Sequence, residues 1–93
     1  MAAVTIARGA HDGPMAWLIT HTLEALNLVH VVQIYADKSK VKAQMHSGFS
    51  VNVAVDVTPE VARRIVRNII DEVTEGHSVE VVGEEVRPIS ALR

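Results

Sequence analysis

The sequence predicts an α+β domain of the ferredoxin-like, split βαβ type, with two helices on one face of a four- or five-stranded, mostly antiparallel sheet. Three observations lead to this prediction: alternating valines from 51 to 57, an amphipathic helical pattern from 58 to 75, and a second helical pattern from 14 to 27. The resulting order is strand, helix, strand, hairpin strand, helix and strand. Right-handed crossovers would place the first and third main strands in the middle of the sheet.

The most regular stretch is a strand that leads directly into a helix. Valines at every second position from 51 to 57 are expected to face the core, because side chains alternate between the two faces of a strand. Thr58 is expected to cap the helix, Pro59 to occupy its first position and Gly76 to end it. The polar face of this helix holds Arg63, Arg64, Arg67, Asn68, Asp71 and Glu72.

The other elements follow from shorter patterns. They are a first strand at 4–7, a helix that begins at Pro14 and ends near Asn27, an apolar strand at 29–36, a strand at 41–45 that pairs with it, and a last strand at 78–82. The helix is predicted from the spacing of Met15, Leu18, Ile19, Leu23 and Leu26. Residues 1–93 are interpreted as one domain, with 83–93 as a C-terminal tail that has one possible extended piece around Val86.

Composition narrows the possible classes of function. The chain has 93 residues, 48% of them hydrophobic, a net charge of −2 and no cysteine. It shows neither the pattern of a signal peptide nor an apolar run long enough to span a membrane, so a cytoplasmic protein without a membrane partner is expected. Nucleic acid is an unlikely partner, because the charge is balanced and the sheet offers at most Tyr35 and Phe49 for stacking on bases.

A sheet covered by helices on one face leaves its other face open. The outward positions are expected to include Ala7, Ala43, Ala54 and part of the strand at 29–36, which together form a rather apolar surface. Such a surface favours association, so the sequence predicts a homo-oligomer that assembles through the sheet or its edge. The opposing interpretation is that the C-terminal tail covers this face within one chain.

Two basic clusters are the candidate sites for a ligand or partner. They are Lys38, Lys40 and Lys42 in the hairpin, and Arg63, Arg64 and Arg67 on the helix that begins at Pro59. Such clusters bind anions or phosphates in some proteins, and in others they are only solvated faces. Arg67 and Asp71 are four residues apart, so part of the charge is expected to be paired within the helix.

No catalytic or metal-binding constellation is identifiable. Histidines occur at 11, 21, 30, 46 and 77, and no two of them have the spacing that forms a metal site within a helix or strand. His11 and Asp12 could act as an acid–base pair, but no nucleophile or second carboxylate accompanies them. No metal, cofactor or catalytic residue is therefore assigned.

The order of elements resembles the ferredoxin-like signalling and ligand-binding domains, such as the PII-like and ACT groups. The resemblance implies dimers or trimers, and it places the hairpin at 38–42 where the PII-like group has a long variable loop. No ligand-binding motif of these groups matches the sequence, so no residue role is carried over.

Together these observations predict a small non-catalytic, homo-oligomeric binding or regulatory module for a small molecule or a protein. One alternative is a small enzyme or metal-handling protein with a histidine site between subunits, drawn from His11, His21 or His46. Another is a viral or accessory protein that binds a host macromolecule.

Overall fold

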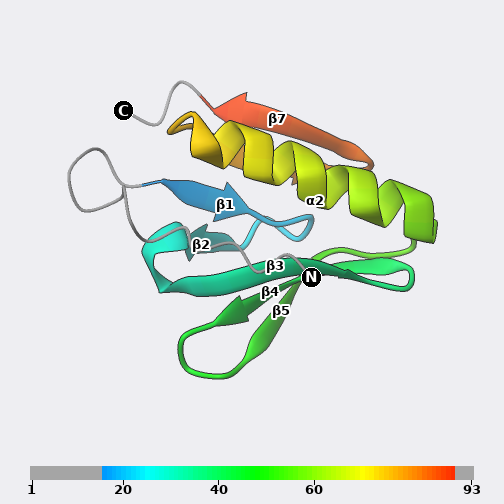
Figure 1. The fold of residues 1–93 in the computed structure, drawn as a ribbon, viewed down its shortest axis with the longest axis horizontal. Coiled ribbons are helices and arrows are strands. Elements are labelled where there is room, and N and C mark those ends of the chain that lie inside the picture. Colours follow the sequence, from blue (N-terminus) through cyan, green and yellow to red (C-terminus); the bar gives the residue numbers. More distant parts are fainter. Residues whose placement is uncertain (1–15, 90–93) are drawn as a thin grey trace.

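The computed structural model describes residues 16–89, which form two β-sheets and one α-helix (Figure 1). The elements are β1 (Trp17–Ile19), β2 (Ala25–Asn27), the 3₁₀ helix η1 (Leu28–His30), β3 (Val31–Asp37), β4 (Lys40–Met45), β5 (Ser50–Ala54), α2 (Pro59–Thr74), β6 (Ser78–Val82) and β7 (Glu85–Ile89). One sheet has the strand order β2-β1-β6-β7, and the other is the meander β3-β4-β5.

The ferredoxin-like prediction is wrong. Residues 16–89 contain seven strands in two sheets and one α-helix, rather than two helices on a single sheet. The resemblance to the PII-like and ACT groups loses its basis with that fold. The strand expected at 4–7 and the predicted helix start at Pro14 lie outside the described residues.

The predicted first helix is a β-hairpin between Trp17 and Asn27 instead. Leu18 of β1 pairs with Leu26 of β2, and both side chains belong to the core. Leu23, which the helical spacing assigned to a buried stripe, has a φ of 65° and is 76% exposed at the turn. The apolar spacing therefore came from two short strands and a turn, a pattern that periodicity does not distinguish from a helix over so few residues.

The meander β3-β4-β5 has an apolar inner face and a polar outer face. Ile34 pairs with Ala43, Val41 pairs with Ala54, and all four side chains are at most 1% exposed. Gln33, Tyr35, Lys42, Gln44 and Asn52 lie at the alternate positions of the ladder. The prediction that Ala43 and Ala54 line an open apolar face is therefore wrong, because both are buried.

Helix α2 forms as predicted, whereas the strand before it, β5, keeps only part of the predicted alternation. The Thr58 hydroxyl accepts a hydrogen bond from the amide of Val61 at 3.1 Å, Pro59 occupies the first turn, and Gly76 follows the helix with a φ of 86°. The alternation breaks within β5, because the consecutive residues Val53 and Ala54 are both buried beside a register shift in the β4–β5 ladder, while Val51 and Val55 are only half-buried. Asp56, with a φ of 58°, then turns the chain after β5. Val57 is nevertheless buried, so the last inward valine reaches the core beyond this turn.

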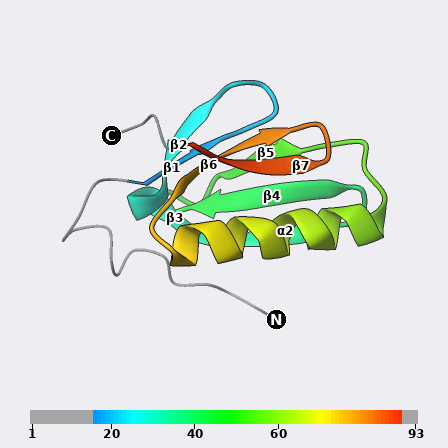
Figure 2. The ribbon, with the colours of Figure 1, turned by 90° about the horizontal axis from the view of Figure 1, so that it is seen from above.

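Helix α2 packs against both sheets and connects β5 to β6 (Figure 2). Its buried stripe consists of Ala62, Ile65 and Ile69, each fully inaccessible to solvent. After the helix, β6 lies parallel to β1 and β7 returns antiparallel to β6. Residues from the expected tail thus form the edge strand β7. None of the described helices has the length and apolar character needed to cross a membrane.

Candidate functional site

A groove of about 490 Å³ lies between the edge strand β3 and helix α2. Its lining is formed by Ile34, Tyr35, Ala36, Arg63, Val66, Arg67 and Ile70. Four of these side chains are aliphatic, and the two arginines supply the charge. The described lining contains no histidine, carboxylate, serine or cysteine. The groove thus offers apolar contact and hydrogen-bond donors, rather than a nucleophile or a general base.

Helical spacing brings the α2 residues to one side of the groove. Positions 63, 66, 67 and 70 are separated by three and four residues, so their side chains project from adjacent turns on the same face. On the other side, Ile34 and Ala36 point inward from β3. The groove is therefore lined by one face of α2, where side chains recur about every 3.6 residues, and by one face of β3, where they recur every two residues.

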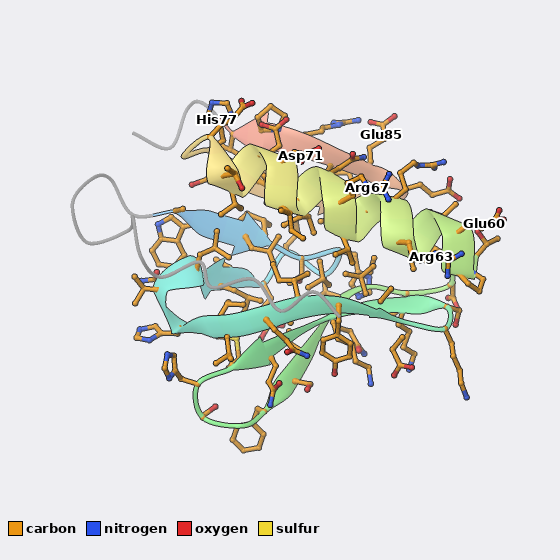
Figure 3. All side chains as sticks on the ribbon, viewed as in Figure 1. Glu60, Arg63, Arg67, Asp71, His77 and Glu85 are labelled. Carbon is orange, nitrogen blue, oxygen red and sulfur yellow. The ribbon has the colours of Figure 1, made fainter. Side chains whose placement is uncertain are left out.

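A backbone hydrogen bond fixes the relative direction of β3 and α2. The amide of Val57 donates to the carbonyl of Ser39 at 3.1 Å, which holds the β3–β4 turn beside the start of α2. The two elements consequently run in opposite directions along the groove (Figure 1). Arg63 and Arg67 lie on successive turns of the helix, nearer to its start than Ile70 is (Figure 3).

Arg63 and Arg67 have no carboxylate partner within residues 16–89. Both are exposed, and neither takes part in a salt bridge there. The predicted pairing of Arg67 with Asp71 is thus not formed. By contrast, Arg64 lies 3.7 Å from the Glu84 carboxylate and does not line the groove. The two guanidinium groups beside the apolar floor are the unneutralised cations of this site.

The structure separates the six residues singled out in the two basic clusters. Only Arg63 and Arg67 line the groove. Lys38 and Lys40 are exposed at the β3–β4 turn, where Lys38 has a φ of 57°. Lys42 points from the outer face of the meander, with its ammonium group 3.4 Å from the Asp37 carboxylate.

Four aliphatic groove residues have no binding role in the sequence-based prediction. The sequence predicts Val66 and Ile70 only as part of the apolar stripe of the helix, and Ile34 and Ala36 only as part of a strand that is apolar on both faces. Ile34 is 1% exposed, whereas Ala36, Val66 and Ile70 are half-buried and border the groove. The sequence signal that could have indicated them is the width of the stripe, which exceeds the three helix positions that become fully buried.

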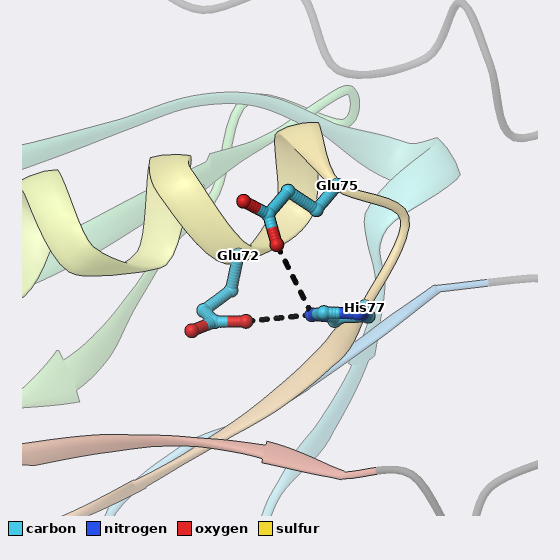
Figure 4. Close-up of side chains that lie close together, drawn as sticks. All are labelled: Glu72, Glu75 and His77. Carbon is cyan, nitrogen blue, oxygen red and sulfur yellow. Dashed lines mark hydrogen bonds and ion pairs between the residues drawn. The ribbon is translucent and has the colours of Figure 1, made fainter.

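A second group of polar side chains lies at the C-terminal end of α2 (Figure 4). His77 Nδ1 donates a hydrogen bond to Glu72 Oε1 at 2.7 Å, and Glu75 Oε1 is 3.9 Å from the same nitrogen. The group is largely exposed and holds the chain reversal at Gly76. Glu72, Glu75 and His77 come together because the chain reverses at Gly76, so their spacing in the sequence does not indicate that they form a group.

The other described histidines do not join this group. The amide of His46 donates to the carbonyl of His30 at 2.8 Å, which places these two residues together at one end of the meander. The His21 amide donates to the carbonyl of Val53 at 3.0 Å, and His21 therefore lies against β5. His11 falls outside the described residues.

Comparisons with family models, with curated proteins and with solved structures found no match for this chain.

Proposed function

We propose that this protein is a small non-catalytic binding module whose β3–α2 groove holds a ligand that is apolar in one part and anionic in another. The observation that carries the proposal is the position of Arg63 and Arg67 beside an aliphatic floor, without a carboxylate partner in residues 16–89. Arginine suits this role because its planar guanidinium donates several hydrogen bonds to a carboxylate, phosphate or sulfonate.

The size and lining of the groove agree with this assignment. Its volume falls within the roughly 300–1,000 Å³ typical of small-molecule sites, which combine apolar walls with a few polar groups. Val66 and Ile70 supply the apolar wall on the helix, and Ile34 and Ala36 supply it on the strand. A ligand with an apolar body would contact these side chains, while its anionic group would accept hydrogen bonds from the arginines.

Two fluorescent dyes of almost the same shape test the proposal. Anilinonaphthalene sulfonate carries one negative charge, and phenylnaphthylamine is its uncharged counterpart. Replacing both arginines (Arg63→Gln with Arg67→Gln) is expected to weaken binding of the sulfonate by about tenfold or more and to change binding of the neutral dye by less than about twofold.

Arg64→Gln is the matched control for this experiment. It removes the same charge from the same helix, but from outside the groove. The control is expected to bind both dyes as the unmodified protein does. Equal losses of sulfonate binding in Arg64→Gln and in the double variant would show a general charge effect and would contradict the proposal.

We also propose that the protein self-associates. The surface involved is not the one expected to include Ala43 and Ala54, because both of these residues are buried. Phe49 is 75% exposed beside the β4–β5 turn, and its carbonyl accepts a hydrogen bond from the amide of Met45. Met45 pairs with Val31, and the next residue, Val32, is 42% exposed. Met45 itself packs against the core, so the exposed apolar side chains at this end of the meander are Val32 and Phe49. We call Val32 and Phe49 the end patch; it is the apolar surface that would support contact between copies.

A further inference from the structure

We propose that Glu72, Glu75 and His77, at the C-terminal end of α2, form a binding site for a divalent transition-metal ion such as zinc. None of these three residues lines the β3–α2 groove, so the site is separate from it. The inference therefore goes beyond the proposed function and does not depend on it.

The candidate ligand atoms already lie close together (Figure 4). His77 Nδ1 is 2.7 Å from Glu72 Oε1 and 3.9 Å from Glu75 Oε1, and each residue has a ligand atom within 4.8 Å of the other two. Two ligand atoms of a tetrahedral zinc ion, each about 2.0–2.2 Å from the metal, are about 3.3–3.5 Å apart. Small rotations of the glutamate side chains would bring both distances from Nδ1 to this value.

Main-chain hydrogen bonds hold the residues that carry these atoms. The amide of His77 donates to the carbonyl of Glu72 at 3.0 Å, and the amide of Gly76 donates to the carbonyl of Val73 at 2.9 Å. With the left-handed φ of Gly76, these bonds form a Schellman motif, in which the residue after the glycine contacts the residue five positions earlier. This contact is commonly apolar, whereas here it joins an imidazole to a carboxylate.

The charge at this end of α2 favours a cation. The C-terminal end of a helix carries a partial negative charge, and the last turn of α2 has no basic residue. Glu72 and Glu75 add two carboxylates, and neither forms an ion pair with a lysine or arginine of residues 16–89. A bound divalent ion would supply positive charge that the described part of the chain provides only through His77.

The donor set indicates which ions fit. One imidazole nitrogen and two carboxylate oxygens suit zinc, copper(II) or nickel(II), whereas calcium and magnesium prefer oxygen ligands. The His77 side chain is 48% exposed, so an ion can approach from solvent. Because Nδ1 would be the ligand atom, the proton that it donates to Glu72 would leave on binding, and the ring would keep its proton on Nε2.

The competing interpretation is that the group only stabilises the end of the helix. A hydrogen-bonded cap needs His77 and Glu72, which lie 2.7 Å apart. It does not need Glu75, whose carboxylate is 3.9 Å from Nδ1 and therefore too far for a hydrogen bond. A metal site uses all three side chains. Glu75 is thus the residue that separates the two interpretations.

Zinc titration of the full chain, followed by calorimetry at neutral pH, tests the site. Zinc is expected to bind at least about tenfold more tightly than calcium or magnesium. Glu75→Gln is expected to weaken zinc binding by about tenfold or more, because it removes one ligand. Glu84→Gln is the matched control, since Glu84 is also exposed but lies beyond the far end of β6. Its zinc affinity should stay within about twofold of the unmodified value.

A second pair of variants examines the histidine. His77→Gln is expected to lose the site, whereas His46→Gln, which replaces another exposed histidine, should bind zinc as the unmodified protein does. Nitrogen-15 spectra of the imidazole rings provide an independent measurement. Zinc is expected to shift the Nδ1 resonance of His77 and to leave its Nε2 protonated. Zinc should also raise the melting temperature of the unmodified protein more than that of Glu75→Gln, because it binds the folded state.

The outcomes decide between a metal site and a helix cap. Equal zinc affinities of Glu75→Gln and Glu84→Gln would overturn the proposal, because zinc would then bind to other histidines or to general surface charge. Coordination through Nε2 of His77, or tighter binding of calcium than of zinc, would also overturn it. If His77→Gln does not fold, the Glu75→Gln comparison still decides, since the Glu75 carboxylate accepts no hydrogen bond within residues 16–89.

Discussion

Thr20 shows how one buried side chain determines the local fold. It is fully buried, and its hydroxyl accepts hydrogen bonds from the amides of Glu24 at 3.1 Å and Thr22 at 3.3 Å. Its own amide donates to the carbonyl of Glu24 at 2.9 Å, so side chain and main chain both close the β1–β2 turn. A threonine whose hydroxyl accepts hydrogen bonds from nearby amides favours a turn over a helix at this position, because these local hydrogen bonds satisfy backbone groups without helical pairing.

Thr20→Val is expected to lower the free energy of unfolding by about 1–2 kcal/mol, because the substitution keeps the shape and removes the hydroxyl acceptor. Denaturant unfolding monitored by circular dichroism measures the change. Thr74→Val is the matched control, since Thr74 is exposed at the end of α2 and its hydroxyl makes no hydrogen bond within residues 16–89, and its effect should stay within about 0.5 kcal/mol. Equal losses in the two variants would mean that the buried hydroxyl has no special role in the turn.

Among the elements, α2 was predictable from sequence and the β1–β2 hairpin was not. The helix has a cap at Thr58, a proline at its first position and an uninterrupted stripe over sixteen residues, so its local signals agree. The hairpin strands contain three residues each, and Leu18 and Leu26 have helical spacing although they lie opposite each other across the turn. Such short strands provide too few alternations to reveal a period of two.

Thr58→Ala removes the side chain that accepts the amide of Val61, and it is expected to lower the free energy of unfolding by about 1 kcal/mol. Thr58→Ser keeps a hydroxyl at the same position and is expected to retain most of the stability. Thermal or urea unfolding of the two variants under the same conditions tests this. If the serine variant loses as much as the alanine variant, the methyl group of Thr58 rather than its hydroxyl stabilises the start of α2.

At the scale of the whole molecule, the groove depends on tertiary arrangement that no single segment specifies. Arg63 and Arg67 could be selected from the sequence because charge on one helix face is visible in the spacing. That β3 is an edge strand could not be predicted, because it depends on the division of seven strands between two sheets. For the same reason the alanines expected on an open face proved to be buried: the meander turns its inner side toward α2 and the core.

Self-association through the end patch predicts a mass of at least twice 10.1 kDa by light scattering at micromolar concentration. Phe49→Ser is expected to lower this mass toward that of one chain, because Phe49 is the largest exposed apolar side chain of the patch. Leu23→Ser is the matched control, since Leu23 is equally exposed but lies at the β1–β2 turn. A single-chain mass for the unmodified protein would end this part of the proposal.

The parallel pairing of β1 with β6 has a consequence for the order in which the chain folds. Leu18 pairs with Val79, and the amide of Trp17 bonds to the Ser78 hydroxyl across 61 residues. The meander can form from neighbouring residues, whereas closing such a long loop is slow and costs chain entropy first. During synthesis, β1 therefore cannot pair with β6 until residues 78–82 have been made. The single tryptophan, located in β1, would report that late step through its fluorescence.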